Sequence, residues 1–598
     1  MRTWRWVSVL AMLVLVLAAC GQQPAATPSA DDESEPPASG AESEAPEPSA
    51  SEDVGGGEPT AGGTLVFGGA RLAASLDPAL TSDGESFRIL QQVYEPLVDL
   101  APGTTDELVG VLAESWTGEP SDTEYVFTLR EGVTFHDGTP LNAEAVKINF
   151  DRMQNFSEEF QGDAYYYGAL MDGFGPENLI SSVEATDELT VTFTLREPSP
   201  TFLFGITLTP FSIISPAILE STNADDAAAS TLGTDVVQGG TGPFMLEDYV
   251  PDDSATLARY EEYWDEPAYL DRVIIRPIAD PAARLQALQG GSVQGFDLVN
   301  PSDYETVESE GFSLVERLSF NSLYLGLNPV ARENAAEAES GVAEGYEGEE
   351  SPLQDLAVRQ AIEMAIDKEA LIEPFYGGRG SVADTFIPPS SGWYDAILAG
   401  VEPAEFDADG ARQILEDAGF TEENPATIHF WYPTEVTRPY MPDPRGLHEA
   451  VTQMLEDAGF VVVPNSDIWD SPGYLFDAQN GFYDLHFLGW TGDYDDPSNW
   501  YGVHFGYSQA EGSDDRTAAA QFGCDVDGLD DAISAADAEL DEAARGEAWA
   551  EVAGLIHENV CFVTLAHGDT ALAFTDVVQG YEPNPTGSES FKTVWLSE

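Results

Sequence analysis

Apolar and polar residues alternate in some stretches of the chain and recur with a helical period in others. The alternation from Tyr125 to Leu129, and again over 187–198, predicts strands that bury one face. The segment 280–291 predicts a helix, because Asp280 can cap it, a proline follows and glycines end it. Helical periodicity marks three further segments: 351–372, 407–420 and the first part of 445–464, which ends as a strand. Because helices and strands interleave throughout, the pattern predicts an α/β or α+β protein with several lobes.

The first residues of the chain match an export signal. Two arginines precede an apolar stretch from Val7 to Ala19, which is too short to span a bilayer comfortably and ends in small residues. The sequence Leu-Ala-Ala-Cys at 17–20 resembles the bacterial lipobox, which implies cleavage before Cys20 and acylation of that cysteine. We therefore expect residues 1–20 to be a lipoprotein signal peptide, with the mature protein anchored to the cell membrane outside the cytoplasm. An ordinary signal peptide with a chance cysteine is the alternative.

Two acidic segments contain few large apolar residues. Residues 21–62 are rich in proline, serine, alanine and acids, so they cannot bury enough surface to fold. We expect them to form a disordered tether to a folded body that begins near Gly63 with a strand-like run. Residues 333–351 are acidic and contain glycines, which predicts a mobile surface loop.

The composition is that of a globular protein with an unusual charge. Hydrophobic residues make up 43% of the 598 residues and aromatic residues 11%, while the formal net charge is −84. Such a negative field repels nucleic acids and anionic membrane surfaces, so neither is an expected partner. The acidity indicates a well-solvated surface rather than a particular activity.

Two cysteines remain once Cys20 is assigned to the lipid anchor. Cys524 and Cys561 lie in a protein expected outside the cytoplasm, where disulfides persist, so a bridge between them is predicted. Two buried free thiols are the alternative.

Signatures of catalysis and of metal binding are missing from the sequence. It contains no HExxH motif, no GxSxG elbow and no Walker loop, and its cysteine spacing fits no zinc cluster. His136 could act as a base, but a turn histidine bonded to its neighbours is the simpler interpretation. We therefore predict a protein that is not an enzyme and that needs no metal or cofactor.

The stretch 489–502, GWTGDYDDPSNWYG, places three aspartates between aromatic residues. Removing water from a carboxylate beside large aromatic rings is costly unless a cation pairs with the carboxylate. The EF-hand pattern fails here because a proline follows Asp496. An organic ammonium is the other candidate, since Trp490 and Trp500 could attract it and Asp493 could bind it. The alternative is a surface turn of acids beside core tryptophans.

Several separated stretches resemble one family. They are LAESWTGEPSDTEYVFTLREGVTFHDGTPLNAEAV at 112–146, GTGPFMLEDYV at 240–250, the run from YWDEPAYLDR to LQALQGG at 263–291, LQDLAVRQAIEMAIDKEALI at 353–372 and FDADGARQILEDAGF at 406–420. Together they resemble the extracellular solute-binding proteins of family 5, which serve peptide-importing and nickel-importing ABC transporters. Within that family the likeness to dipeptide binders is greatest, at 103–116, 436–449 and 489–501.

The resemblance implies a two-lobed periplasmic binding protein fold of type II, in the cluster C subclass. The first lobe is expected at 63–318, with an extra subdomain at about 95–235, and the C-terminal residues 570–598 return to it. The second lobe is expected at 319–569, and the strands that cross between the lobes are expected within 319–328 and 565–574.

The resemblance also implies the roles of individual residues. Asp493 matches the family's acceptor for a peptide's α-ammonium, and Arg438 matches its acceptor for the α-carboxylate. The remaining predicted ligand-binding residues are Tyr440, Trp469, Gly489, Trp490, Thr491, Gly492 and, from the loop TSDG at 81–84, Thr81 and Ser82. One acid and one guanidinium held apart on a rigid frame would measure the end-to-end length of a dipeptide.

The predicted function is therefore capture of dipeptides, or short oligopeptides, in a cleft between two lobes. The expected partners are the ligand, the transmembrane subunits of an ABC permease and the membrane through a lipid anchor, with the protein itself a monomer. Other members of the family bind longer oligopeptides, nickel chelates, haem or oligosaccharides, and these stay alternatives. A nickel chelate would call for histidines near the cleft, for which His486 and His504 are candidates. A secreted hydrolase is the alternative from another class.

Overall fold

The computed structural model describes residues 58–338, 340–346, 350–469, 473–506, 519–587 and 589–597. These residues belong to one compact unit. The predicted signal peptide, the predicted lipidation site Cys20 and nearly all of the predicted tether lie outside the described residues. None of the helices within the described ranges is long and apolar enough to cross a bilayer.

A seven-stranded mixed sheet contains the first strand of the body. Its order is β12 (Ser313–Arg317), β19 (Thr570–Phe574), β11 (Gly295–Phe296), β1 (Thr64–Gly69), β10 (Arg272–Pro277), β9 (Ser254–Arg259) and β8 (Phe244–Val250). Strand β1 is central and pairs in parallel with β10 and β11, whereas the outer pairs are antiparallel. In β1 the side chains of Leu65 and Phe67 are fully buried, as the strand-like run near Gly63 predicts.

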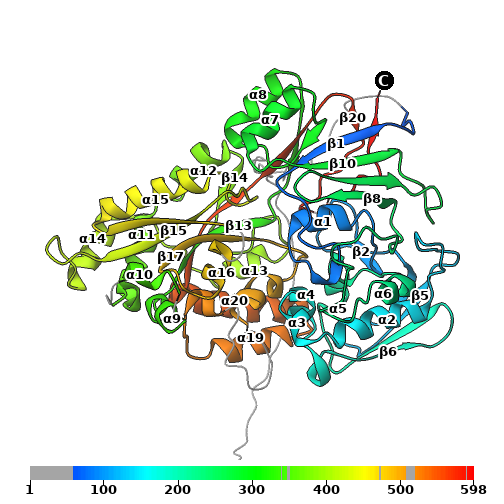
Figure 1. The fold of residues 1–598 in the computed structure, drawn as a ribbon. Helices are drawn as coiled ribbons and strands as arrows, with labels where there is room; N and C mark the ends of the chain where they lie inside the picture. The colour runs from blue at the N-terminus through cyan, green and yellow to red at the C-terminus, as the bar shows by residue number, and fades with distance from the viewer. Residues whose placement is uncertain are drawn as a thin grey trace, which may run out of the picture. The chain divides into compact units, whose positions relative to one another are not determined.

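A six-stranded mixed sheet is built from the later part of the chain. Its order is β14 (Gly380–Val382), β18 (Phe562–Gly568), β13 (Asn321–Leu327), β17 (Leu485–Thr491), β15 (Thr427–Thr434) and β16 (Val461–Ile468). All seven residues of β13 are buried, which is expected of a strand covered on both faces. Helices flank this sheet in Figure 1, with α14 (Ala408–Asp417) and α15 (Pro444–Ala458) on one side and α20 (Glu542–Glu558) on the other.

The chain passes between the two sheets at two closely placed points. It leaves β12 at Arg317 and enters β13 at Asn321, and it returns from β18 to β19 through Asp569. The two crossings are joined by hydrogen bonds, because Asn321 Nδ2 donates to the Gly568 carbonyl at 2.8 Å and the Ser319 amide donates to Asp569 Oδ1 at 3.0 Å. This arrangement confirms the predicted α/β two-lobed fold, whereas the numbered limits of the lobes stay a prediction.

A smaller antiparallel sheet has the order β4 (Ala113–Thr117), β5 (Glu124–Leu129), β7 (Thr190–Leu195) and β6 (Ile180–Ala185). It has its own apolar cluster, which includes Phe127, Phe150 and Phe193. Two strand pairs complete the sheets: β2 (Val98–Leu100) with β3 (Leu108–Gly110), and β20 (Val578–Gln579) with β21 (Trp595–Leu596).

The remaining helices connect and cover these sheets. In the first part of the chain they are α1 (Gly84–Leu90), α2 (Ala143–Gln154), α3 (Glu158–Gln161), α4 (Tyr165–Leu170), α5 (Phe202–Gly205), α6 (Pro216–Ser221), α7 (Pro281–Gln289) and α8 (Tyr304–Ser309). Later helices are α9 (Ala331–Glu337), α10 (Ala343–Tyr346), α11 (Leu356–Ala365), α12 (Glu369–Tyr376), α13 (Tyr394–Leu398), α16 (Tyr474–Gln479), α17 (Tyr501–Phe505), α18 (Ala519–Phe522) and α19 (Leu529–Asp537).

Predicted caps lie where the sequence places them. Asp280 accepts a hydrogen bond from the Ala283 amide at the start of α7, and Asn142 caps α2 in the same way. One expectation is wrong: the segment 333–351 is not simply a loop, because its described part contains most of α9 and all of α10. Ala335 and Tyr346 are buried there, so apolar residues spaced among the acids are enough to dock two short helices.

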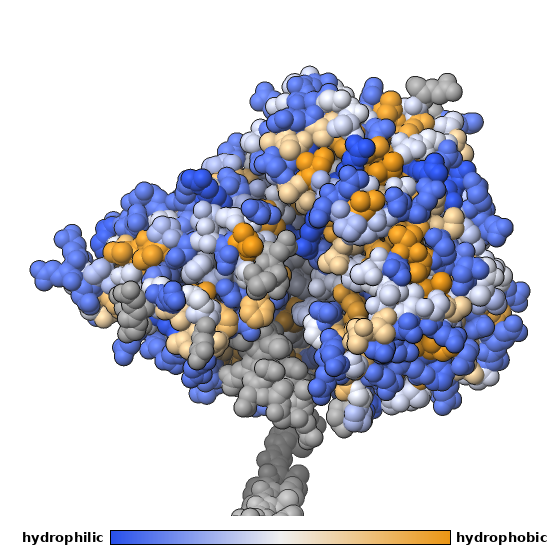
Figure 2. Space-filling model, viewed as in Figure 1, coloured by the Kyte–Doolittle hydropathy of each residue, from blue (hydrophilic) through white to orange (hydrophobic). Residues whose placement is uncertain are grey.

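The surface seen in Figure 2 is mostly hydrophilic, with apolar residues in small groups. A furrow runs between the part with the six-stranded sheet, on the left, and the part with α1 to α6, on the right. The hydrophilic surface agrees with the strongly negative charge of the sequence.

Candidate functional site

Strand β17 brings the predicted stretch to the middle of the six-stranded sheet. Its last residue, Thr491, pairs with Asn321 of β13, and the Gly492 amide donates to the Phe320 carbonyl at 2.8 Å. A Cβ at Gly492 would lie 2.4 Å from the Phe320 ring and 2.7 Å from Trp500. Glycine is therefore required at this position, because the chain passes directly over two aromatic rings.

Gly489 allows a second close approach within the same strand. A Cβ at this position would lie 2.4 Å from the ring of Tyr440 and 2.4 Å from the Ser322 carbonyl. The ring of the predicted site residue Tyr440 thus packs on the backbone of β17. Tyr440 is buried, and its carbonyl accepts a hydrogen bond from the Tyr376 hydroxyl at 2.8 Å.

The carboxylate of Asp493 is held by neutral donors. Asn499 Nδ2 donates to Oδ2 at 3.0 Å, and the hydroxyl of Tyr166, from α4, donates to Oδ1 at 2.9 Å. Within the described ranges no lysine, arginine or histidine lies at salt-bridge distance from this carboxylate. Burial raises the pKa of Asp493 to about 6, although both hydrogen bonds act in the opposite direction.

The next two aspartates have structural partners. Asp496 accepts two hydrogen bonds from Arg545 of α20, from Nε at 2.9 Å and from Nη2 at 2.7 Å. Asp495 accepts from the Ser391 hydroxyl and from the Gly392 amide. The cation expected for the aspartate stretch is thus an arginine of the chain itself for Asp496, whereas Asp493 and Asp495 both accept hydrogen bonds from neutral donors. Asp495 is buried, so Asp493 is the more exposed of these two carboxylates.

The two tryptophans of the stretch differ in their surroundings. Trp490 is partly buried, donates from Nε1 to Asn499 Oδ1 at 3.3 Å and packs against the ring of His504. Trp500 is fully buried between Phe320 and Phe386. The suggestion that both tryptophans could attract an ammonium is therefore wrong for Trp500, which has no exposed face.

The guanidinium of Arg438 lies over an aromatic ring. Its Cζ is 4.4 Å from the centroid of the Trp469 ring. No carboxylate lies within salt-bridge distance of it in the part of the chain that the structure describes, and its buried Nε has no hydrogen-bond partner there. Arg438 is thus a second charged group without an ion-pair partner.

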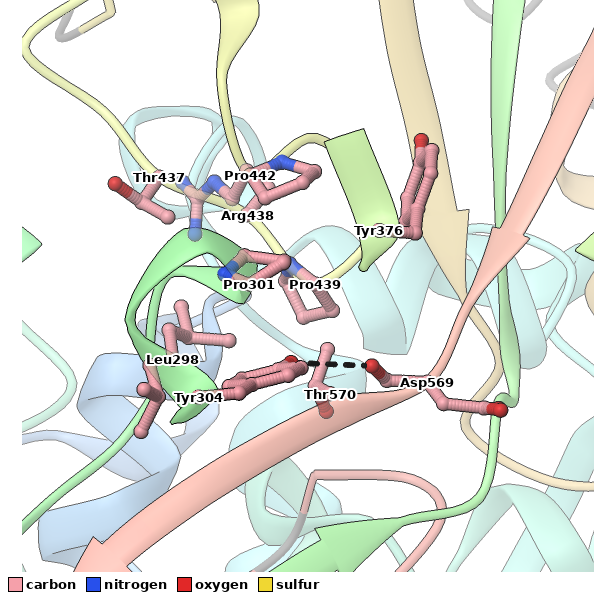
Figure 3. A pocket seen from close by; sticks show the side chains of 11 residues that line it. Leu298, Pro301, Tyr304, Tyr376, Thr437, Arg438, Pro439, Pro442, Asp569 and Thr570 are labelled. Atoms are coloured by element: carbon pink, nitrogen blue, oxygen red, sulfur yellow. Dashed lines mark hydrogen bonds between the residues drawn. The ribbon is translucent and has the colours of Figure 1, made fainter. Parts of the chain in front are cut away.

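A small cavity with room for about one water lies beside Arg438 (Figure 3). In Figure 3 the wall residues come from the segment that leads into α8, from the loop that contains Arg438, and from the crossing between β18 and β19. At this crossing the Tyr304 hydroxyl donates to the Asp569 carbonyl at 3.5 Å. The lining residues are Leu298, Val299, Pro301, Tyr304, Tyr376, Thr437, Arg438, Pro439, Pro442, Asp569 and Thr570.

The predicted loop at 81–84 leads into α1, whose first residue is Gly84. Thr81 is buried and its hydroxyl donates back to the Pro78 carbonyl at 2.8 Å, whereas Ser82 is exposed. The next residue, Asp83, caps α1 and pairs with Arg71 at 3.0 Å. Burial alone would raise the pKa of Asp83, but Arg71, the bonds from Ser86 and the nearby Arg438 together lower it.

The histidines considered as chelate ligands belong to the core. His486 is fully buried and faces Gln521, and burial lowers its pKa to about 3. His504 is buried too, with Nδ1 against the Trp500 carbonyl and a pKa lowered by burial to about 4. The described residues contain no group of three or more histidine, cysteine or acidic side chains able to hold a metal ion.

The structure also gives the surroundings of the predicted cysteine pair and of His136. Cys524 and Cys561 are joined by a disulfide, with their Cα atoms 5.5 Å apart. His136 Nε2 lies 2.9 Å from the Gly242 carbonyl and its ring packs against Tyr260, so it is a turn residue held in place by its neighbours.

The structure joins the predicted residues in three pairs and adds other residues to them. Tyr440 contacts Gly489 and Arg438 contacts Trp469, while Trp490 and Asp493 share Asn499. Thr81 and Ser82 come directly before Asp83, and the charge of Arg438 helps to lower the pKa of Asp83. Sequence reasoning missed Asn499 and Tyr166; the first lies in the quoted stretch, but nothing local marks the second, which is 327 positions from Asp493.

Comparison with known proteins gives the family. The model of the bacterial extracellular solute-binding proteins, family 5 Middle, matches residues 107–512. This chain belongs to that family. It is 28% identical over 542 residues to the dipeptide-binding protein of Escherichia coli, covering 89% of this chain and 94% of that protein. It is also 28% identical over 596 residues to heme-binding protein A of Haemophilus influenzae, covering 97% of both.

Solved structures support the same fold. The dipeptide binding protein from Pseudoalteromonas, in complex with Met-Leu, has a TM-score of 0.75 at 21% identity and covers 90% of this family 5 chain and 100% of its own. The ABC transporter-associated periplasmic binding protein DppA from Helicobacter pylori, in complex with peptide STSA, has a TM-score of 0.74 at 24% identity, covering 90% and 99%. The family and the fold predicted from the sequence are confirmed.

Proposed function

We propose that this family 5 protein binds dipeptides, or short peptides with free termini, and delivers them to an ABC permease. The observation that carries the proposal is the Asp493 carboxylate, which is partly buried and bonded to neutral donors with no cation at salt-bridge distance within the described residues. A ligand ammonium would supply the missing charge through a charge-assisted hydrogen bond. The family resemblance predicts that Asp493 is the ammonium acceptor, and this arrangement supports that role.

Arg438 would take the other end of the ligand. An arginine without a carboxylate partner, stacked on Trp469, has its planar fork available for the α-carboxylate. The rigid frame between the two charged ends would consist of the predicted residues Tyr440, Gly489, Trp490, Thr491 and Gly492. Thr81 and Ser82 would approach the ligand from the loop that leads into α1. A zwitterion whose two charges match this frame would bind best. Chemistry on the ligand is not part of the proposal, so the protein acts as a carrier without enzymatic activity.

Calorimetric titration tests the proposal. A dipeptide should bind with a dissociation constant in about the micromolar range. Acetylating its amine, amidating its carboxylate or adding residues should each weaken binding, because one charged end then loses its partner. Asp493→Ala and Arg438→Ala should each cost about 3–5 kcal/mol of binding free energy. Arg445→Ala, which removes an exposed arginine paired with Glu449, should leave the affinity unchanged. Equal affinity for the free and the acetylated dipeptide would overturn the proposal.

The cellular role adds two expectations of its own. We infer that Cys20 carries the lipid anchor, so that the mature, monomeric protein works at the outer side of the cell membrane beside its permease. Mass spectrometry of the mature N-terminus should find an acylated Cys20, and Cys20→Ala should release the protein from membranes. Incubation of the purified protein with peptides should yield no cleavage products; their formation would favour the hydrolase alternative.

A further inference from the structure

Asn499 makes three hydrogen bonds around the Asp493 carboxylate and carries no charge. Its Oδ1 accepts from the Asp493 amide at 2.9 Å and from Trp490 Nε1 at 3.3 Å, while its Nδ2 donates to Asp493 Oδ2 at 3.0 Å. Asn499 is fully buried. A buried amide with these partners has little freedom to move, because leaving them unsatisfied would cost about 1–3 kcal/mol for each group.

The two N–H donors fix which way the amide points. Only an oxygen can accept from both Trp490 Nε1 and the Asp493 amide, so the nitrogen of Asn499 must face the carboxylate. Rotation of the side chain would place two N–H groups against two N–H groups and the oxygen against a carboxylate. The carboxylate of Asp493 therefore has a donor on Oδ2 whose position is set by β17 and by the loop that follows it.

The other groups around this carboxylate are neutral as well. Tyr166 donates to Oδ1 at 2.9 Å, and the ionisable neighbours whose titration responds to Asp493 are Tyr165, Tyr166 and Tyr494. Burial raises the pKa of all three above the usual value, so they are protonated near neutral pH. No cationic group of the described residues acts on Asp493, whereas Asp496 is neutralised by Arg545.

We infer that Asn499 is a positioning residue for ammonium recognition, which orients the Asp493 carboxylate while leaving its negative charge for the ligand. This inference rests on the proposed function. A lysine or arginine in the same place would also orient the carboxylate, but it would cancel the charge that the ligand needs. An apolar side chain would leave the charge without orientation and with one donor fewer.

The inference predicts a change in the pH dependence of binding. An ammonium binds the ionised carboxylate, so affinity for a dipeptide should fall as the pH is lowered through about 6, the pKa of Asp493. A hydrogen bond to the ionised form lowers a pKa, so removing the Asn499 donor should move this midpoint upward. For Asn499→Leu, which keeps the approximate volume, we expect an upward shift of about one pH unit. Binding should then be about threefold weaker near pH 6.5 and about tenfold weaker well below pH 6.

The experiment is calorimetric titration of one dipeptide between pH 5 and 7.5, with each affinity corrected for the titration of the dipeptide's own amine, whose pKa is about 7.7–8.0. The proteins are the wild type, Asn499→Leu, Asp493→Asn and the control Asn142→Leu. The control removes another asparagine that accepts a backbone amide, at the start of α2, so it perturbs the structure away from the site. It should lower the melting temperature and leave the midpoint of binding at the wild-type pH.

The outcomes separate this inference from the proposed function. If Asp493→Asn binds as tightly as the wild type, the ammonium site is wrong and the role of Asn499 falls with it. If Asp493→Asn loses binding while Asn499→Leu binds more weakly with an unchanged midpoint, Asn499 is merely structural and only this inference is overturned. A midpoint that moves upward in Asn499→Leu and stays in place in Asn142→Leu supports it.

A second variant keeps the test decisive if Asn499→Leu does not fold. Tyr166→Phe removes only the hydroxyl that donates to Asp493 Oδ1 and adds no charge. Neutral donors set the state of the carboxylate in our account, so its midpoint should move upward too, by less than one pH unit. A folded Tyr166→Phe protein with the wild-type midpoint would overturn the account of the carboxylate on which the role of Asn499 depends.

Discussion

Asp493 and Asp496 lie three positions apart in one turn, yet their surroundings are opposite. Asp496 meets a buried arginine through two hydrogen bonds, and Arg545 is bonded in turn to the carbonyls of Ala536 and Asp537. Asp493 meets an amide and a phenol, both neutral. A buried charge with a complete internal partner stabilises one arrangement of the chain, whereas a charge with neutral partners is available to a ligand.

Arg545 and Arg438 differ in the same way. Arg545 forms an ion pair with Asp496, while Arg438 lies against the Trp469 ring with no carboxylate at ion-pair distance among the described residues. Composition does not distinguish these pairs, because both acids belong to one short stretch. What distinguishes them is the neighbour that packing places opposite each charge: Arg545 of α20 for Asp496, neutral donors for Asp493 and an aromatic ring for Arg438. A charged side chain that has no ion-pair partner within the fold is therefore a better guide to the binding site than the presence of charge alone.

The largest effect is expected from breaking the internal pair. Arg545→Ala strands the buried Asp496 carboxylate, so the free energy of unfolding should fall by about 3–5 kcal/mol. Asp493→Asn removes no ion pair and should change the free energy of unfolding by less than about 2 kcal/mol. Urea unfolding of the ligand-free proteins measures both. Equal losses for the two variants would contradict the contrast between the aspartates.

The next largest effect is expected from a substitution in the backbone frame between Asp493 and Arg438. Gly489→Ala would push a methyl group into the Tyr440 ring and the Ser322 carbonyl, so we expect a loss of about 1–3 kcal/mol in the free energy of unfolding and weaker dipeptide binding. Gly162→Ala is the matched control, since its methyl group would meet nothing within 4 Å. If both alanines are tolerated equally, Tyr440 does not need the close approach to β17.

The Asp493 carboxylate should also make the free energy of unfolding depend on pH. The pKa of Asp493 is about 6 in the folded protein against 3.8 for an unperturbed aspartate, so the folded state holds its proton more tightly. Stability from this group is therefore greatest below pH 4 and is lost as the pH rises through about 6. The loss should be at most about 2 kcal/mol, because Asp493 is only partly buried.

Unfolding in urea at several pH values measures this contribution as the difference between the wild type and Asp493→Asn. The difference should change between pH 4 and pH 6.5 and be constant above. A difference that does not vary with pH would show that the carboxylate is solvated and that burial does not hold its proton.

The smallest effect is expected at the arginine end. Trp469→Leu removes the ring beneath Arg438, and we expect dipeptide binding to weaken by about 0.5–2 kcal/mol because a cation–π contact no longer holds the guanidinium in place. Trp116→Leu, in the four-stranded sheet, serves as a control and should bind as the wild type does. A Trp469→Leu protein with unchanged affinity would show that the ring does not orient Arg438.

The sequence by itself determined the local structure, the class and the family of this protein. Periodicity and caps such as Asp280 and Asn142 act between residues close in the chain, so the helices they predict are found in place. The stretch that contains Asp493 could be identified for the same reason. The acidic segment 333–351 was harder, because its two short helices depend on docking a few apolar residues against the core.

Only the tertiary structure decided which charged side chains have an ion-pair partner within the fold. Arg545 lies 49 positions from Asp496 and Tyr166 lies 327 positions from Asp493, and no local pattern links the members of either pair. Their meeting depends on how α20 and α4 pack against the turn after β17. Electrostatic partners are chosen by packing over long separations, whereas helix and strand propensity is settled within a few residues.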